Sequence, residues 1–185
     1  MDYREVAEVV EPQPCHIAYL RTLTDPLEAD YIAVHTASQH TLLLVIPKIS
    51  NELVLQSLFL NSNNTPKVRT KAFNNFKSQH SFERIVSATD DFWGLNFLGN
   101  QDLPSTLLIK LLSHSLPIQL VRVISSKLSD DELCSLVLNG GTGPNLQCYL
   151  DSIRDPSRII EMSNIAEDSH LRASLSSYVS ANEYL

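Results

Sequence analysis

The sequence has little cysteine, little glycine and no long apolar run. Its three cysteines, Cys15, Cys134 and Cys148, form an odd and widely spaced set, which predicts reduced thiols and excludes a disulfide framework. The longest apolar segment, Leu42 to Ile46, is far shorter than the ~20 residues that a membrane span needs. The N-terminal sequence MDYREVAEVVEPQP has acids where a signal peptide has a basic and then an apolar region. We therefore expect a cytoplasmic or nuclear protein without membrane association.

A surplus of basic residues is also lacking. The chain carries 14 Lys and Arg against 21 Asp and Glu, a net charge of -7. Such a surface repels nucleic acid and anionic lipid at long range, so nucleic acid is not the expected partner. A hydrophobic content of 43% with 19% charged residues is typical of a globular chain. No internal repeat of solenoid or propeller period is recognisable.

The residue patterns predict a single α/β or α+β domain over residues 1–185. Thr41 to Ile46 is apolar without alternation, which is typical of a strand covered on both faces. We expect a mixed β-sheet with N-terminal strands, a mostly helical C-terminal part over 129–185, and a candidate subdomain break near 61–66. The expected strands are residues 15–23, 31–35, 41–46, 67–73 and 116–125, whereas 81–88 fits either state. The expected helices are residues 3–10, 52–60, 104–113, 129–139, 146–153 and 169–180.

Three of the five glycines fall in the stretch LNGGTGPN, residues 138–145. The interpretation that we favour is a connector between two helices. Ser129 and Glu132 match a capping box that starts a helix, Gly140 can end it in a left-handed conformation, and Pro144 can open the next helix.

The alternative takes the residues before these glycines as a strand. A strand followed by GGTG resembles the phosphate-binding turn of the short-chain dehydrogenase-like families and the loop of molybdopterin-binding proteins. This resemblance implies a nucleotide- or cofactor-binding enzyme that uses the loop 139–145. Its cofactor-binding residues would be Gly140, Gly141, Thr142 and Gly143.

The segment 66–77 contains four cations and no acid. With phenylalanines interleaved, it could hold RNA by pairing phosphates with the cations and stacking bases on the rings. That is a second alternative, an RNA-contacting accessory protein of the kind that a small virus encodes. The interpretation that we favour is that this segment is an edge strand, whose lysines discourage pairing with the sheet of another molecule. The RNA-contacting residues would be Lys67, Arg69, Lys71 and Lys77.

No catalytic or metal-binding constellation emerges from the remaining residues. Cys15 and His16 are neighbours, so on a strand their side chains would point to opposite faces. The six histidines lack the short recurring spacings of a zinc site. We assign no catalytic residue, metal or cofactor, and expect a non-enzymatic interaction module, an adaptor, regulatory or small structural subunit that binds a protein partner or itself. The candidate interface residues are Phe92, Trp93, Phe97, Tyr178 and Tyr184.

Overall fold

The computed structural model describes residues 1–140 and 143–182 and divides the chain into two compact units, Met1–Gly94 and Leu95–Leu185. Every regular element in these described residues is a helix, and no strand occurs among them. The predicted mixed β-sheet is therefore wrong. No described helix has both the length and the apolar character needed to cross a membrane.

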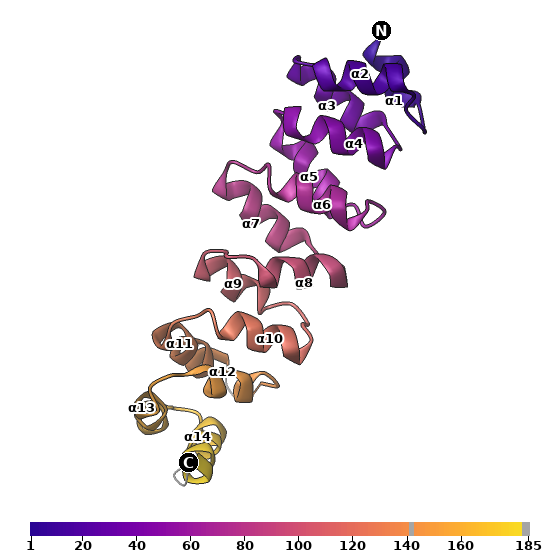
Figure 1. The fold of residues 1–185 in the computed structure, drawn as a ribbon. Helices are drawn as coiled ribbons and strands as arrows, with labels where there is room; N and C mark the ends of the chain where they lie inside the picture. The colour runs from indigo at the N-terminus through magenta and orange to yellow at the C-terminus, as the bar shows by residue number, and fades with distance from the viewer. Residues whose placement is uncertain (141–142, 183–185) are drawn as a thin grey trace. The chain divides into compact units, whose positions relative to one another are not determined.

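The first unit contains a short helix at the N-terminus followed by helices that alternate with brief connections (Figure 1). It ends at Gly94, and residues 61–65 connect two of its helices. The elements are α1 (Tyr3–Glu8), α2 (Pro14–Thr22), α3 (Pro26–His35), α4 (Gln39–Val45), the 3-10 helix η1 (Ile46–Lys48), α5 (Glu52–Leu60), α6 (Pro66–Phe73) and α7 (Gln79–Ala88).

Helix α8 (Phe92–Asn100) begins in the first unit and continues into the second. The capping box at Ser129 is confirmed, because Glu132 accepts from the Ser129 backbone N–H at 2.9 Å while its own N–H donates to Ser129 Oγ at 3.3 Å. The other helices of the second unit are α9 (Ser105–Leu111), α10 (Ile118–Ser125), α11 (Asp130–Gly140), α12 (Leu146–Ser152), α13 (Ser157–Ile165) and α14 (Ser169–Asn182).

All five predicted strands are helical, lying mainly in α2, α3, α4, α6 and α10. Their start signals are ordinary helix signals: Pro14, Pro26 and Pro66 occupy the first turn, where the missing N–H costs nothing. The run Thr41 to Ile46 was misread because α4 packs against α2, α3 and α6. A helix covered on several sides has the same unbroken apolar sequence as a buried strand.

The helices recur with a regular period that the sequence analysis missed. Helices α3, α5, α7, α9, α11 and α13 begin at residues 26, 52, 79, 105, 130 and 157, so successive starts are 25 to 27 residues apart. No single residue type recurs in the repeat, but each of these helices has a buried apolar residue five to seven positions after its start. The residues there are Ile32, Leu58, Ile85, Leu111, Val137 and Met162.

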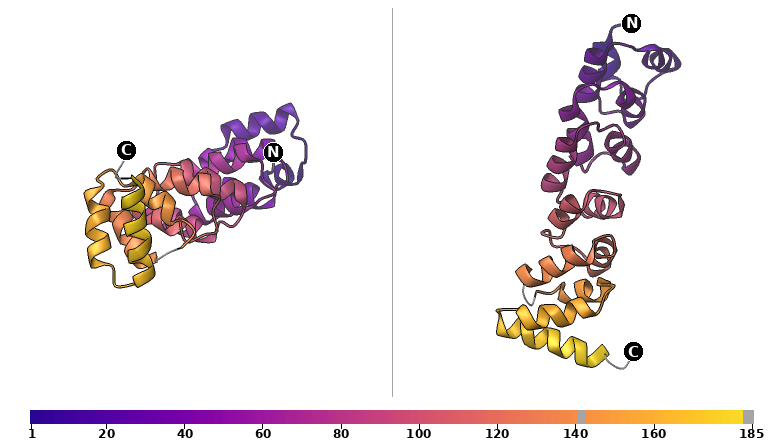
Figure 2. Two further views of the ribbon diagram at one scale, coloured as in Figure 1. Left: turned by 90° about the horizontal axis from the view of Figure 1, so that it is seen from below. Right: turned by 90° about the vertical axis from the view of Figure 1, so that its left-hand side faces the viewer.

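Within each unit, successive repeats pack in two rows. In the first unit α1, α3, α5 and α7 contact one another in order, and α2, α4 and α6 form the second row. In the second unit α11 packs on α13, and α10 packs on α12. The right-hand view of Figure 2 shows the two rows of the first unit side by side. Within a unit, a repeat thus buries its apolar face against the next one along the chain.

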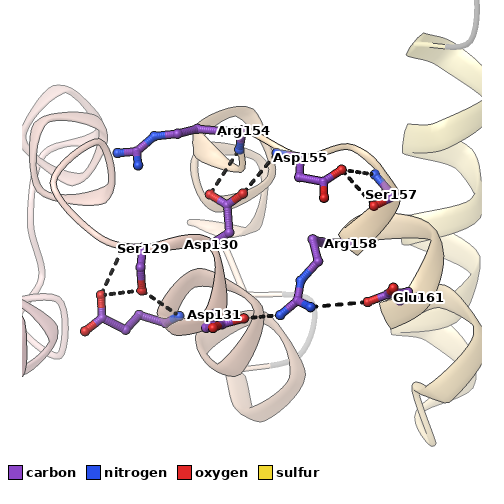
Figure 3. Close-up of polar contacts among 9 residues, drawn as sticks. Ser129, Asp130, Asp131, Arg154, Asp155, Ser157, Arg158 and Glu161 are labelled. Carbon is purple, nitrogen blue, oxygen red and sulfur yellow. Dashed lines mark hydrogen bonds and ion pairs between the residues drawn. The ribbon is translucent and has the colours of Figure 1, made fainter.

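Carboxylates fix the odd-numbered row by capping the helix of the following repeat. Asp30 accepts from the backbone N–H of Ser50 at 3.1 Å, just before α5. In the second unit Asp130 accepts from the backbone N–H groups of Arg154 and Asp155, at 3.1 and 2.9 Å, just before α13 (Figure 3). These bonds satisfy N–H groups that lie outside the helical ladder, and so they set the register between repeats.

Glu52 makes the same connection from α5 to the start of α7. It accepts from the backbone N–H groups of Lys77 and Ser78, at 2.9 and 3.0 Å, and from the hydroxyls of Ser78 and Ser81. The hydroxyls of Ser78 and Ser81, followed by these backbone donors, lower the pKa of Glu52 from 4.5 to about 2. The four donors therefore favour the ionised carboxylate.

We expect Glu52→Gln to lower the free energy of unfolding by about 2 kcal/mol at pH 7, since hydrogen bonds to a charged group are the stronger kind. The folded pKa lies below the unfolded value of 4.5. The stabilisation is therefore complete above that value and is lost as the pH falls toward 2. Urea titrations of both proteins between pH 7 and pH 3 should show the difference shrinking below pH 4.5. A difference that is constant over this range would contradict the role given to Glu52, and exposed Glu8→Gln is the control.

Cations fix the even-numbered row by reaching back to carbonyl groups of the preceding repeat. Lys48 Nζ donates to the carbonyls of Arg21 and Leu23, at 2.8 and 2.6 Å, at the end of α2. In the second unit Lys127 Nζ donates to the carbonyls of Gly99 and Gln101, at 3.0 and 2.8 Å, at the end of α8. These carbonyls have no intrahelical partner, and a positive charge also suits the C-terminal end of a helix.

Lys127→Met should therefore lower the free energy of unfolding by about 1.5 to 2 kcal/mol, because two carbonyl groups lose a charged donor while the apolar stem is kept. Lys110→Met is the matched control, since Lys110 is an exposed lysine on α9. It should change stability by less than ~0.5 kcal/mol. Equal effects of the two substitutions in urea denaturation would show that the backbone contacts of Lys127 do not hold the repeats together.

Candidate protein-binding surface

Helix α3 begins at a strong local signal and turns one face to the core. The Asp25 side chain accepts from the Leu27 N–H at 2.8 Å, and Pro26 takes the first helical position. Ala29, Ile32 and Ala33 are buried on the inner face. With about 3.6 residues per turn, the residues at positions 27, 31 and 34 must then lie on the opposite face.

That outward face of α3 is apolar. Leu27 is 74% exposed and Val34 is 60% exposed. Tyr31 lies between them and is half-buried, because Tyr3 of α1 packs edge-on against its ring, with the centroids 5.1 Å apart, and His35 stacks on it at 4.0 Å. A ring nitrogen of His35 donates to the Tyr31 carbonyl at 2.7 Å, which fixes the stack in place.

Helix α5 extends this surface at the equivalent repeat position. Leu53 is the second residue of α5, as Leu27 is of α3, and it is 55% exposed. Helices α3 and α5 are in contact. The surface does not continue onto α7, where the corresponding residues are the exposed His80 and Ser87. We call the residues Leu27, Tyr31, Val34 and Leu53 the α3–α5 face.

In the part of the chain that the structure describes, no other helix has two large exposed apolar side chains in line along one face. Ile160 and Ile165 of α13 are 49% and 64% exposed, but they are five residues apart and so point in different directions. Isolated exposed apolar residues are normal on any protein surface, whereas a contiguous group indicates a binding site. Among the described residues, Ile160 lines a hollow together with Tyr178 and Val179, and Ile165 lines another together with Leu138. The α3–α5 face differs from both because its exposed side chains follow one helix and continue onto α5.

The interface residues predicted from sequence are divided between the two units. Phe92 is 69% exposed and remains a candidate anchor, while Trp93 is half-buried beneath Arg69. In the second unit Phe97 is half-buried, and the half-buried Tyr178 donates to Asp151 at 3.1 Å. Burial and this carboxylate raise the pKa of Tyr178 to about 12. Tyr184 lies outside the described residues.

The basic segment lies on α6 and in the connection that follows it, not on an edge strand. Arg69 is only 2% exposed, and Lys71 donates to the Leu43 carbonyl at 2.6 Å, so both cations serve the fold. Lys67 and Lys77 are exposed. The interleaved phenylalanines are also unavailable for stacking bases, because they pack against one another; they are Phe73, Phe76 and Phe82.

The glycine stretch connects two helices, as the favoured interpretation predicted. Gly140 ends α11 and α12 begins at Leu146, so the prediction that Pro144 takes the first position of this helix is wrong. Gly140 has no left-handed φ, so its predicted closing conformation is wrong. A hollow of about 330 Å³ borders this connection, lined by Gly140, Gly143 and Tyr149 among others. The residues before the turn are helical, which removes the strand that the dehydrogenase resemblance requires; Gly141 and Thr142 lie outside the described residues.

Metal chemistry has no candidate centre within residues 1–140 and 143–182, where no three His, Cys, Asp or Glu side chains gather as ligands. Comparison of the sequence with models of protein families found no match, and neither did searches of curated proteins and of solved structures. Evidence for the function therefore comes from the geometry of the chain itself.

The α3–α5 face was not predicted from the sequence, because residues 31–35 were assigned to a strand. A usable signal was present in the sequence. Asp25 followed by Pro26 marks a helix start, and the apolar spacing of Leu27, Tyr31 and Val34 then defines one helical stripe.

Proposed function

We propose that this protein is a helical-repeat interaction module that binds a protein partner through the α3–α5 face. The observation that carries the proposal is the apolar stripe of Leu27, Tyr31 and Val34, which points away from the core. Tyrosine is one of the residue types that supply most of the energy at protein interfaces, and contiguous exposed apolar side chains around it are typical of an interaction site. The polar contacts between repeats support the proposal, because they hold α3 and α5 in a fixed register and so reduce the ordering cost of binding.

Site-specific photo-crosslinking in cells that produce the protein tests this proposal. A benzophenone side chain placed at position 27, 34 or 53 should form an adduct with one common partner. The same probe at His80 or Ser87, the equivalent exposed positions of α7, should give little adduct. Equal yields at all positions, or adducts only at Phe92, would contradict the proposed location of the surface.

A second experiment tests whether the side chains of Leu27 and Val34 bind the partner or only lie near it. Leu27→Ser combined with Val34→Ser should abolish the adduct formed by the probe at position 53 while leaving the thermal unfolding midpoint nearly unchanged. The stability expectation follows from the exposure of both side chains, since surface substitutions usually act within ~0.5 kcal/mol. An adduct that survives the double substitution would show that these side chains do not provide the binding energy.

A further inference from the structure

The region around the α3–α5 face is strongly acidic. Residues 1–60, which include α3 and α5, contain eight Asp and Glu against three Lys and Arg, a net charge of -5 out of -7 for the whole chain. Five of these carboxylates already accept hydrogen bonds: Asp2 from the Arg4 N–H, Asp25 from the Leu27 N–H, Glu28 from Tyr19 Oη, Asp30 from the Ser50 N–H and Glu52 from the Lys77 N–H. The other three are exposed to solvent.

Several exposed acids belong to the helix that flanks the stripe. Glu5 and Glu8 lie on α1, which packs on α3 and places Tyr3 against Tyr31. Glu11 follows α1 and is exposed as well. Three basic residues are included in this charge: Arg4, which lies over the Tyr3 ring, Arg21 and Lys48. The segment as a whole therefore remains negative.

We infer that the segment which docks on the α3–α5 face is a cationic amphipathic helix, with apolar residues along one side and Lys or Arg beside them. This inference rests on the proposed function of that face. Leu27 and Val34 are seven residues apart, about 10 Å along the helix axis. A partner helix with apolar residues at positions i, i+3 or i+4, and i+7 presents a stripe of the same length.

Charge also argues against the other occupants. In a symmetric dimer formed through this face, the same patch meets itself, so a charge of -5 would oppose a charge of -5. Nucleic acids and anionic membranes are repelled for the same reason. A cationic partner is instead attracted at long range, and its binding buries the apolar stripe.

The test uses the full chain and three fluorescent helical peptides that share one leucine stripe and carry Lys, Gln or Glu on the flanks. Fluorescence anisotropy should give an affinity for the Lys peptide about tenfold above that for the Gln peptide, with the Glu peptide weakest. The Lys advantage should fall as the salt rises from about 0.05 to 0.3 M, because exposed charges are screened. A Lys peptide with a scrambled stripe should not bind.

Protein variants identify the groups responsible. Glu5→Gln, Glu8→Gln and Glu11→Gln together should remove the Lys advantage without changing the Gln affinity. The control carries the same change in net charge at acids on α7, on α13 and in the connection after α13, and it should keep the advantage. Its substitutions are Glu83→Gln, Glu161→Gln and Glu167→Gln.

The outcomes separate this inference from the proposed function. Equal binding of the Lys and Gln peptides that is lost in Leu27→Ser/Val34→Ser would overturn the cationic partner and leave the binding face in place. A dimer, detected by light scattering and lost in the same double variant, would identify a second copy as the occupant and overturn the inference. If no peptide binds through Leu27 and Val34, the inference also fails, and crosslinking still decides whether the face binds another protein.

Discussion

Replacing Arg69 by methionine is expected to lower the free energy of unfolding of the first unit by about 3 kcal/mol, the cost of breaking a largely buried ion pair. Its guanidinium donates to both carboxylate oxygens of Asp91, at 2.9 and 2.6 Å, and to the Phe59 carbonyl at 2.6 Å. It also lies over the Trp93 ring, 4.3 Å from the centroid. Hydrogen bonds from Arg69 hold the pKa of Asp91 below its ordinary value.

The measurement is urea denaturation followed by the fluorescence of Trp93, the single tryptophan of the chain, and by circular dichroism. Lys67→Met is the matched control on the same helix, since Lys67 is exposed; it should act within ~0.5 kcal/mol. Asp91→Asn should recover part of the loss in the Arg69→Met background, because it removes the orphaned charge. A loss below ~1 kcal/mol for Arg69→Met would show that the ion pair does not contribute to the stability of the fold.

Gly94→Ala and Gly140→Ala are expected to change stability in opposite directions. A Cβ at Gly94 would lie 2.5 Å from Thr89 Cγ2, 2.8 Å from Asp91 Oδ2 and 2.9 Å from a guanidinium nitrogen of Arg69. Two of these atoms belong to the ion pair of Arg69 with Asp91, and the third lies beside it. They cannot move away from the added Cβ without breaking that pair. We expect Gly94→Ala to lower the free energy of unfolding by about 2 kcal/mol, in the range of overpacked cores.

At Gly140, by contrast, no atom lies within 4 Å of the added Cβ, and the residue is helical. Alanine there should raise the free energy of unfolding by about 0.5 kcal/mol, because it restricts the unfolded chain. Thermal unfolding of the two variants beside the parent protein measures both effects. A destabilised Gly140→Ala protein, or an unaffected Gly94→Ala protein, would contradict the packing described around these glycines.

The sequence predicted the helical parts of this fold wherever caps and period agreed. Ser129 and Glu132 marked the start of α11, and the helices over 52–60 and 169–180 were confirmed almost to the residue. The connection at residues 139–145 also follows, since the helix before it and the helix after it were both predicted. Local signals were sufficient there because they depend on a few neighbouring residues.

The sequence could not predict features that depend on the neighbouring repeat. Thr41 to Ile46 is apolar on all sides because three other helices cover α4, and periodicity cannot distinguish that arrangement from a buried strand. Gly94 and Gly99 matter for packing because Arg69 and Leu120 leave no room for a Cβ at these positions. The sequence does not show these neighbours. The contact of Lys127 with Gly99 spans 28 residues and has no local signature.

The same limit applies to the candidate site. Arg69 looked available for RNA because its partner Asp91 is 22 residues away in the sequence. The α3–α5 face was hidden because its stripe exists only if residues 26–35 form a helix and α5 lies beside them. The sequence therefore shows where the cations and aromatic residues are. Their roles become visible only when one repeat packs on the next.

The proposed binding face requires the predicted strands to be helices, and so do the ion pair and the contacts between repeats. Far-UV circular dichroism of the full chain tests this requirement most directly. The account predicts a helical spectrum with a helix content near 71% and no strand component. A helix content of about one third together with a clear strand signal, as in an average mixed domain, would contradict the helical repeat and with it the outward stripe on α3.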